Sequence, residues 1–124
     1  MFTMQLNELQ LEEGWLETDP PVGWRATEPI KGVPEIDTLG AVYFELEPGE
    51  TLVAHKDKED EIVVLLSGTG EATVGDETAT VDAHGIVFIP AMVPHGFTNT
   101  GSETLRAFGV FAGPDYEGEI AQGG

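Results

Sequence analysis

The sequence predicts a single all-β domain in the form of a small β-barrel. From residue 38 onward the chain consists of short runs of strand-forming residues, and glycine or proline stands at nearly every junction between them. Many short strands with such regular punctuation are typical of a sandwich or a barrel. The same part of the chain has no apolar pattern long and periodic enough for a helix. Its 124 residues are the size of one domain.

Residues 1–37 are predicted to form a lead-in to this domain. Prolines concentrate here, and the apolar spacing in 6–16 indicates no more than a short helical turn. We expect one edge strand at 24–30, because a proline cannot donate a hydrogen bond to a neighbouring strand and is confined to edges and turns.

The barrel is expected over residues 38–112. Its first strand, 38–46, is followed by a turn at 47–50 that contains a Pro-Gly pair. Gly75 and Asp76 separate two strand-like runs and predict a tight hairpin. The remaining strands are expected at 51–55, 62–66, 71–74, 78–81, 85–89, 96–99 and 104–111. Residues 113–124, rich in glycine and poor in apolar residues, are expected to form a loose tail.

Charge is the unusual feature of the composition: 23 acidic residues stand against five basic ones, a formal net charge of −18. The acids are spread along the whole chain among apolar strands, which favours a halophilic protein adapted to high salt; an ordinary acidic cytosolic protein is the alternative. This charge repels nucleic acid and anionic membrane surfaces, so neither is an expected partner. No segment approaches the ~20 apolar residues of a membrane span, and residues 1–13 do not resemble a secretory signal, so a cytoplasmic location is expected. The absence of cysteine excludes disulfides, thiolate metal sites and a cysteine nucleophile.

A histidine followed by a run of acids gives the first indication of chemistry. His55 closes a predicted strand, and four of the next six residues are acidic. On an extended chain residues 55, 57, 59 and 61 project to one face, because strand side chains alternate. Imidazole nitrogen and carboxylate oxygen together suit Fe, Mn, Ni or Zn. Taken alone, however, such a run is more typical of a solvated surface turn.

Two spaced motifs resemble those of the cupin family. The first comprises Gly49, His55, Asp57, Glu61 and Gly68, and the second comprises Gly85, Pro90, His95 and Asn99. The chain departs from the family pattern at Asp57, where a second histidine is usual, and at Met92, where glycine is usual; Gly85 also lies one residue closer to Pro90 than is common. The resemblance covers about residues 38–112 and implies a cupin-type jelly-roll β-barrel with a short N-terminal lead-in.

Carried over residue by residue, the resemblance implies that His55, Glu61 and His95 hold one divalent metal ion. We expect Asp57 as a fourth ligand, directly or through a water molecule, because a carboxylate is shorter than an imidazole. Glu59 is the alternative if the loop is rearranged. The extra carboxylate favours Fe(II) or Mn(II), whereas the general order of affinity favours Ni, Cu and Zn, so the identity of the metal stays open.

Other residues are expected to be structural. His84 lies in a predicted turn and is expected to be exposed, and Asn99 is expected to be a structural hydrogen-bonding residue. Phe97 alternates with His95 and is expected to line the pocket. Arg106 is expected to pair with an acid across neighbouring strands. The aromatic residues expected to fill the barrel are Tyr43, Phe88, Phe108 and Phe111.

The function implied by the resemblance is metal binding, with a small-molecule metalloenzyme of dioxygenase type as the first hypothesis. An isomerase or decarboxylase that uses the metal as a Lewis acid is an alternative. A non-catalytic barrel that holds a sugar or an organic acid is another, as is a barrel that has lost its metal. Fold analogy alone does not choose among them, and no catalytic residue is assigned. Because barrels of this family commonly pair, we expect a homodimer that involves segment 24–30.

Overall fold

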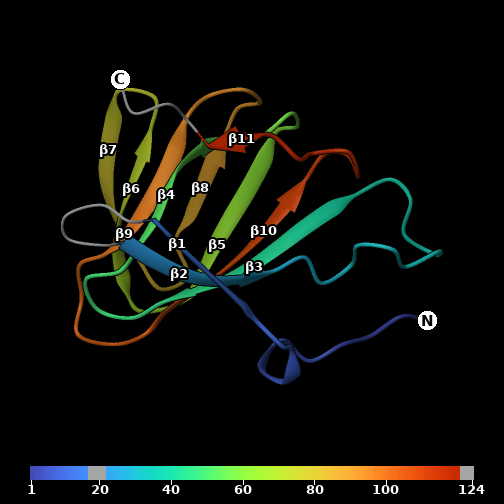
Figure 1. The fold of residues 1–124 in the computed structure, drawn as a ribbon, viewed down its shortest axis with the longest axis horizontal. Coiled ribbons are helices and arrows are strands. Elements are labelled where there is room, and N and C mark those ends of the chain that lie inside the picture. The colour runs from blue at the N-terminus through green and yellow to red at the C-terminus, as the bar shows by residue number, and fades with distance from the viewer. Residues whose placement is uncertain (17–21, 121–124) are drawn as a thin grey trace.

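The computed structural model describes residues 1–16 and 22–120 and shows an all-β protein with two antiparallel sheets (Figure 1). The chain begins with a single 3₁₀ turn, η1 (Leu6–Glu8). The strands in chain order are β1 (Glu12–Leu16), β2 (Val22–Thr27), β3 (Gly40–Leu46), β4 (Thr51–Lys56), β5 (Glu61–Ser67), β6 (Thr69–Val74), β7 (Glu77–Asp82), β8 (Ile86–Ile89), β9 (His95–Asn99), β10 (Leu105–Phe111) and β11 (Glu119–Ile120). Sheet A has the order β1-β2-β3-β10-β5-β8, and sheet B has the order β11-β4-β9-β6-β7.

The core lies between the two sheets. Strand side chains alternate, so every second residue of β5 and β10 points inward and is buried. Val63 and Leu105 of sheet A are fully buried and meet Phe97 of sheet B in one apolar cluster. Among residues 1–16 and 22–120, each hydrogen-bonded strand pair joins two strands of the same sheet, and no pair links sheet A to sheet B. The fold is therefore all-β, as predicted, but it consists of two facing antiparallel sheets and not of the closed barrel that the sequence predicted.

The eight strands predicted from residue 38 onward are confirmed as β3 to β10, each displaced by at most two residues at either end. The hairpin prediction is also confirmed, because Val74 pairs with Glu77 and leaves Gly75 and Asp76 as the loop. Gly75 has a φ of +62°, which a glycine adopts without strain. Turn chemistry and alternation were therefore sufficient to place these strands.

The lead-in and the tail differ from the predictions. The predicted edge strand at 24–30 is present as β2, but it is not at the edge, because β1 pairs along it from Glu12 to Leu16. The prediction of a loose tail was wrong for residues 116–120: β11 pairs with the end of β4, and Tyr116 is 7% exposed. The ring of Tyr116 stacks on Phe111 with centroids 4.0 Å apart. Residues 121–124 of the predicted tail lie outside the described residues.

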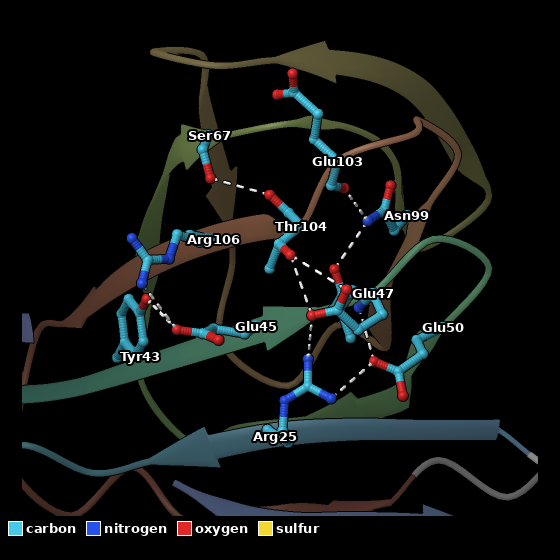
Figure 2. Close-up of polar contacts among 11 residues, drawn as sticks. Arg25, Tyr43, Glu45, Glu47, Glu50, Ser67, Asn99, Glu103, Thr104 and Arg106 are labelled. Carbon is cyan, nitrogen blue, oxygen red and sulfur yellow. Dashed lines mark hydrogen bonds and ion pairs between the residues drawn. The ribbon is translucent and has the colours of Figure 1, made fainter. Parts of the chain in front are cut away.

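A network of ion pairs and hydrogen bonds links the two sheets at one end (Figure 2). Arg25 of β2 reaches Glu47 at 3.2 Å and Glu50 at 3.3 Å, on either side of the turn between β3 and β4. Asn99 of β9 donates from Nδ2 to the carbonyl oxygens of Leu46 and Glu103, at 2.8 and 2.7 Å. The network therefore joins β2, the turn after β3, and the loop before β10.

No helix in the part of the chain that the structure describes has both the length and the apolar character needed to cross a bilayer.

Candidate metal centre

A cavity of about 680 Å³ lies against the inner faces of both sheets. Its apolar wall contains Trp24, Phe44, Leu52, Phe97 and Phe111. Its more exposed part carries the acids Glu12, Glu13, Glu28 and Glu117 together with Lys31. His55, Asp57, Glu61 and His95 also line it. The sequence-predicted ligands therefore share one cavity, whose wall is apolar on one part and acidic on another.

The two histidines face each other across a strand pair. His55 of β4 and His95 of β9 are register partners, and their ring centroids lie 4.3 Å apart. Nδ1 of His55 lies 2.9 Å from the carbonyl oxygen of Val53, and Nδ1 of His95 lies 3.0 Å from that of Val93. A carbonyl oxygen only accepts, so each Nδ1–H must donate. In the neutral ring this leaves the lone pair on Nε2, which is the form that binds a metal.

Asp57 lies between the two imidazoles. Its Oδ2 is 3.4 Å from Nε2 of His55 and 3.3 Å from Nε2 of His95. One ligand atom from each of these three residues lies within 4.8 Å of the others. Glu61, at the start of β5, places Oε1 3.5 Å from Nε2 of His95 but lies outside that group of three. Of the two carboxylates, Asp57 therefore lies nearer to the Nε2 atoms of the two histidines, and Glu61 lies farther from them.

Two buried polar atoms at this point have no hydrogen-bond partner among the described residues: Oδ2 of Asp57 and Nε2 of His95. Leaving a buried polar atom unpaired costs about 1–3 kcal/mol, and more for a charged group. Both atoms are Lewis bases, and they lie 3.3 Å apart. A divalent cation between them would satisfy both, so the residues present fit a metal ion.

The pKa values of His55, Asp57 and Glu61 reflect the burial of these side chains and their closeness to one another. Burial raises the pKa of Asp57, but the two neighbouring imidazoles outweigh it and lower that pKa to about 2. Burial and the Asp57 carboxylate raise the pKa of Glu61 to about 8. Burial opposes protonation of His55, yet the Asp57 carboxylate and the Val53 carbonyl together leave its pKa raised. A bound cation would favour the charged forms of both carboxylates.

The backbone around Asp57 is fixed by a strained residue. The N–H of Met92 donates to the carbonyl oxygen of Asp57 at 2.7 Å. Met92 has a φ of +66°, a conformation that glycine adopts freely and that other residues rarely adopt. This position is where the sequence departs from the family glycine. The strain coincides with a contact that holds a candidate ligand, as is common at functional sites.

Several sequence predictions about individual residues are confirmed. His84 is exposed, Asn99 makes structural hydrogen bonds, and Phe97 is 3% exposed and lines the cavity. Arg106 lies 3.4 Å from Glu45 across a strand pair. The alternative ligand Glu59 is not in the cavity; its carboxylate lies beside Gly113 instead. Residues 57–60 form a loop, so strand alternation does not carry Glu59 to the face of His55.

Two predictions of barrel-filling aromatic residues were wrong. Phe88 is 57% exposed, and it pairs with Ile62 on the outer face of sheet A. Phe108 also lies on the outer face, because its neighbours Ala107 and Gly109 are the inward-facing residues of β10. Phe111 does line the cavity. Both faces of these strands are apolar, so the sequence pattern does not tell which face is inside.

The contribution of the C-terminal segment to the cavity was not predicted from the sequence. Tyr116, Glu117 and Gly118 line the cavity. The hydroxyl of Tyr116 donates to Glu28, and Lys31 pairs with Glu117. The N–H of Lys58 donates to the carbonyl oxygen of Tyr116 at 2.9 Å. The segment is short and polar, and the lone tyrosine was the one signal that it packs.

Comparison with known proteins agrees with this fold. The family described as Cupin domain matches residues 42–111. An uncharacterised protein of Streptomyces coelicolor is 36% identical over 72 residues, which cover 58% of this chain and 68% of that protein. A predicted oxalate decarboxylase of Thermotoga maritima has a TM-score of 0.74 at 19% identity and is covered to 99%, with 90% of this chain aligned. The oxalate decarboxylase of Bacillus subtilis, described with Mn(II) centres, has a TM-score of 0.66 at 22% identity, covering 77% of this chain and 26% of that one.

Proposed function

The chain belongs to the cupin family, and from this premise we propose that it is a small-molecule metalloenzyme of dioxygenase type. In this proposal His55, Asp57, His95 and Glu61 hold one divalent metal ion. The observation that supports it most directly is the pair of buried, unpaired Lewis bases, Oδ2 of Asp57 and Nε2 of His95, 3.3 Å apart. Two imidazoles with one carboxylate and open coordination positions are the ligand set of non-haem Fe(II) oxygenases.

The metal would supply Lewis acidity and, in the case of Fe(II), the capacity to react with dioxygen. The manganese of the Bacillus subtilis oxalate decarboxylase supports Mn(II) as a second candidate. Carboxylate ligands favour both ions over softer ones. The Nδ1–H bonds of His55 and His95 to backbone carbonyls hold the imidazoles in the metal-binding tautomer.

The cavity wall indicates the chemical class of the substrate. Trp24, Phe44, Phe97 and Phe111 offer aromatic surface that would bury an apolar group and exclude water. Among the described residues that line the cavity, Lys31 is the one cation, and it is paired with Glu28 and Glu117. Apart from the metal, whose charge the Asp57 and Glu61 carboxylates would offset, a dianion would therefore meet acidic side chains and no free protein cation among these residues. We infer an uncharged or singly charged organic substrate with an apolar part.

A second candidate function is metal-anchored binding of such a molecule without turnover. The presence of Asp57 in addition to Glu61 favours it, because each further protein ligand removes a coordination position that oxygen or substrate would need. A decarboxylase or isomerase that uses the metal as a Lewis acid remains compatible with the ligand set. Beyond the metal itself, the described residues that line the cavity offer no free cation to bind a second carboxylate, which argues against small dicarboxylates as its substrates.

The test begins with the metal. Protein purified without added metal or an affinity tag is expected to contain about one equivalent of a divalent transition metal, measured by elemental analysis. His55→Ala and His95→Ala should each lose most of it, because a site of few ligands depends on each one. The matched control is His84→Ala, which removes the exposed histidine outside the cavity. Full metal content in the double variant of His55 and His95 would refute the site.

Activity is tested separately with the Fe(II)-loaded protein. Oxygen uptake is followed with a panel of catechols, diketones and hydroxy acids, and ligand binding is followed by the fluorescence of Trp24 in a Trp15→Phe background. Uptake that disappears in His55→Ala and persists in His84→Ala supports the oxygenase. A change in Trp24 fluorescence when a compound is added, together with no oxygen uptake for any compound with any metal, would favour the non-catalytic function.

A further inference from the structure

One acidic side chain stands at the end of an apolar row that faces the cavity. Glu12 of β1 is the register partner of Ala26 of β2, and Ala26 is the register partner of Phe44 of β3. Register partners in antiparallel strands project to the same face of the sheet, and both Ala26 and Phe44 line the cavity. Since β1 is the edge strand of sheet A and neighbouring strands lie ~4.8 Å apart, the backbone of Glu12 lies ~10 Å from that of Phe44.

The indole of Trp24 lies on the same face, beside Glu12. Gly14 of β1 is the register partner of Trp24, and it shares the face of Glu12 because strand side chains alternate. A Cβ built on Gly14 would lie 2.3 Å from Cε2 of Trp24, so the indole covers the bare backbone of β1 at this point. Trp24 also lines the cavity. A carboxylate and an aromatic ring therefore adjoin at this end of the cavity wall.

The charge of Glu12 is available to a ligand, unlike that of the neighbouring acids. Glu28 lies 3.6 Å from Lys31, and Glu117 pairs with the same lysine. Glu13 projects to the opposite face of β1, since successive strand residues alternate. Glu12 is exposed, and its carboxylate forms no hydrogen bond or ion pair with another described residue. Glu12 is thus the acid of this part of the cavity that can bind a cation without giving up a partner.

From these observations we propose that the cavity binds an organic ammonium ion whose charged group is held between Glu12 and Trp24. The apolar part of the same molecule lies against Phe44 and Phe97 of the cavity wall. A carboxylate attracts the ammonium group, and the face of an indole binds it through a cation–π contact. The unpaired, buried Nε2 of His95 in the same cavity is a separate sign that a ligand is received there. The inference rests on the proposed function in one respect, that the substrate binds in this cavity.

The charge of the whole cavity favours a cation over a neutral molecule or an anion. A divalent metal ion and Lys31 together carry three positive charges, and more acidic residues than that line the cavity: Glu12, Glu13, Glu28, Asp57, Glu61 and Glu117. The net charge of −18 on the chain also raises the concentration of cations near its surface. An aliphatic amine stays protonated at neutral pH, as lysine does, and its ammonium group has no lone pair for the metal. It would therefore leave the open coordination positions free.

The test is isothermal titration calorimetry of the full chain with three probes that share a benzyl group: benzyltrimethylammonium, benzyl alcohol and benzylsulfonate. The quaternary nitrogen cannot ligate a metal, so its binding reports on Glu12 and Trp24. It should bind about tenfold more tightly than the other two probes, the combined effect of an exposed ion pair and a cation–π contact. Glu12→Gln and Trp24→Leu should each weaken the cation by about threefold and leave benzyl alcohol less affected. The matched control is Glu71→Gln, which removes the same charge from an exposed position of β6 outside the cavity.

Circular dichroism shows that each variant has folded, and the metal content is measured on the same samples. Equal affinity for the three probes, or tighter binding of benzylsulfonate, would overturn the proposal. Equal weakening by Glu12→Gln and Glu71→Gln would overturn it too, because net charge alone would then attract the cation. A full metal content without preference for the cation would remove the ammonium inference and leave the metal site. A preference for the cation in protein that holds no metal would support the inference and count against the metalloenzyme.

Discussion

Replacing Gly109 with alanine should disturb the candidate metal centre without removing any of the four proposed ligands. Gly109 lies on β10 with its missing side chain directed at Glu61. A Cβ built there would lie 2.2 Å from Oε2 of Glu61 and 3.1 Å from Cγ1 of Val42. Ordinary van der Waals contact begins at 3.4 Å, so the carboxylate would have to move by about 1.2 Å. Overpacking of this kind costs about 1–3 kcal/mol of stability.

The displaced carboxylate should weaken metal binding by about 10- to 100-fold, the usual effect of disturbing the groups that support a metal site. The assay is competition with a chromophoric chelator for Mn(II) and for Fe(II), with urea unfolding of the same samples. The matched control is Gly101→Ala, whose new Cβ would meet its nearest neighbours at 3.4 to 3.6 Å and lies far from the cavity. Metal affinity in Gly109→Ala equal to wild type would refute the role given to Glu61.

Three further predictions concern stability. Asn99→Ala should lower the free energy of unfolding by about 2–4 kcal/mol, because it leaves the Leu46 and Glu103 carbonyls and the Gly101 N–H unpaired; a loss under about 0.5 kcal/mol in urea unfolding would contradict this. Burial and the hydrogen bond to Glu45 raise the pKa of Tyr43 to about 12, so the unfolded chain ionises first and stability should fall by about 2 kcal/mol between pH 10 and pH 12. That fall should be shallower in Tyr43→Phe, and an equal fall in both proteins would exclude Tyr43 as its cause. The melting temperature should rise steeply from dilute buffer to molar salt, since screening removes repulsion within a chain of net charge −18. A melting temperature that calorimetry finds unchanged by salt would refute the interpretation of the acidic composition as an adaptation to high salt.

The strands from residue 38 onward were predictable because turn-forming residues mark their boundaries. Pro48 and Gly49 end one strand, and Gly75 with Asp76 turns the next hairpin. These residues adopt turn conformations by themselves, so no knowledge of distant contacts is needed. The same holds for His55 and His95, which stand at fixed distances from turn residues and become neighbours once β4 and β9 pair.

What could not be predicted depends on contacts between distant segments. The run from Ile62 to Leu66 is apolar throughout, so alternation does not reveal that Ile62 faces outward and Val63 inward. β11 has only two residues and no strand-like composition; its pairing with β4 is accompanied by the packing of Tyr116. The place of Asp57 is likewise set by a loop and by the bond from Met92, neither of which follows from strand spacing.

The bonds from His55 and His95 to the carbonyls of Val53 and Val93 bear on how this site can change during evolution. In each case the acceptor is a peptide group two positions earlier in the same segment, and every amino acid supplies one. Substitutions at Val53 or Val93 therefore leave the acceptor in place, and no distant side chain has to be preserved for either ring to keep its tautomer. Drift at the carboxylate positions can then proceed while the imidazoles stay aligned. A lineage could in this way exchange the usual histidine for Asp57 in one step, altering the charge of the centre without rebuilding it.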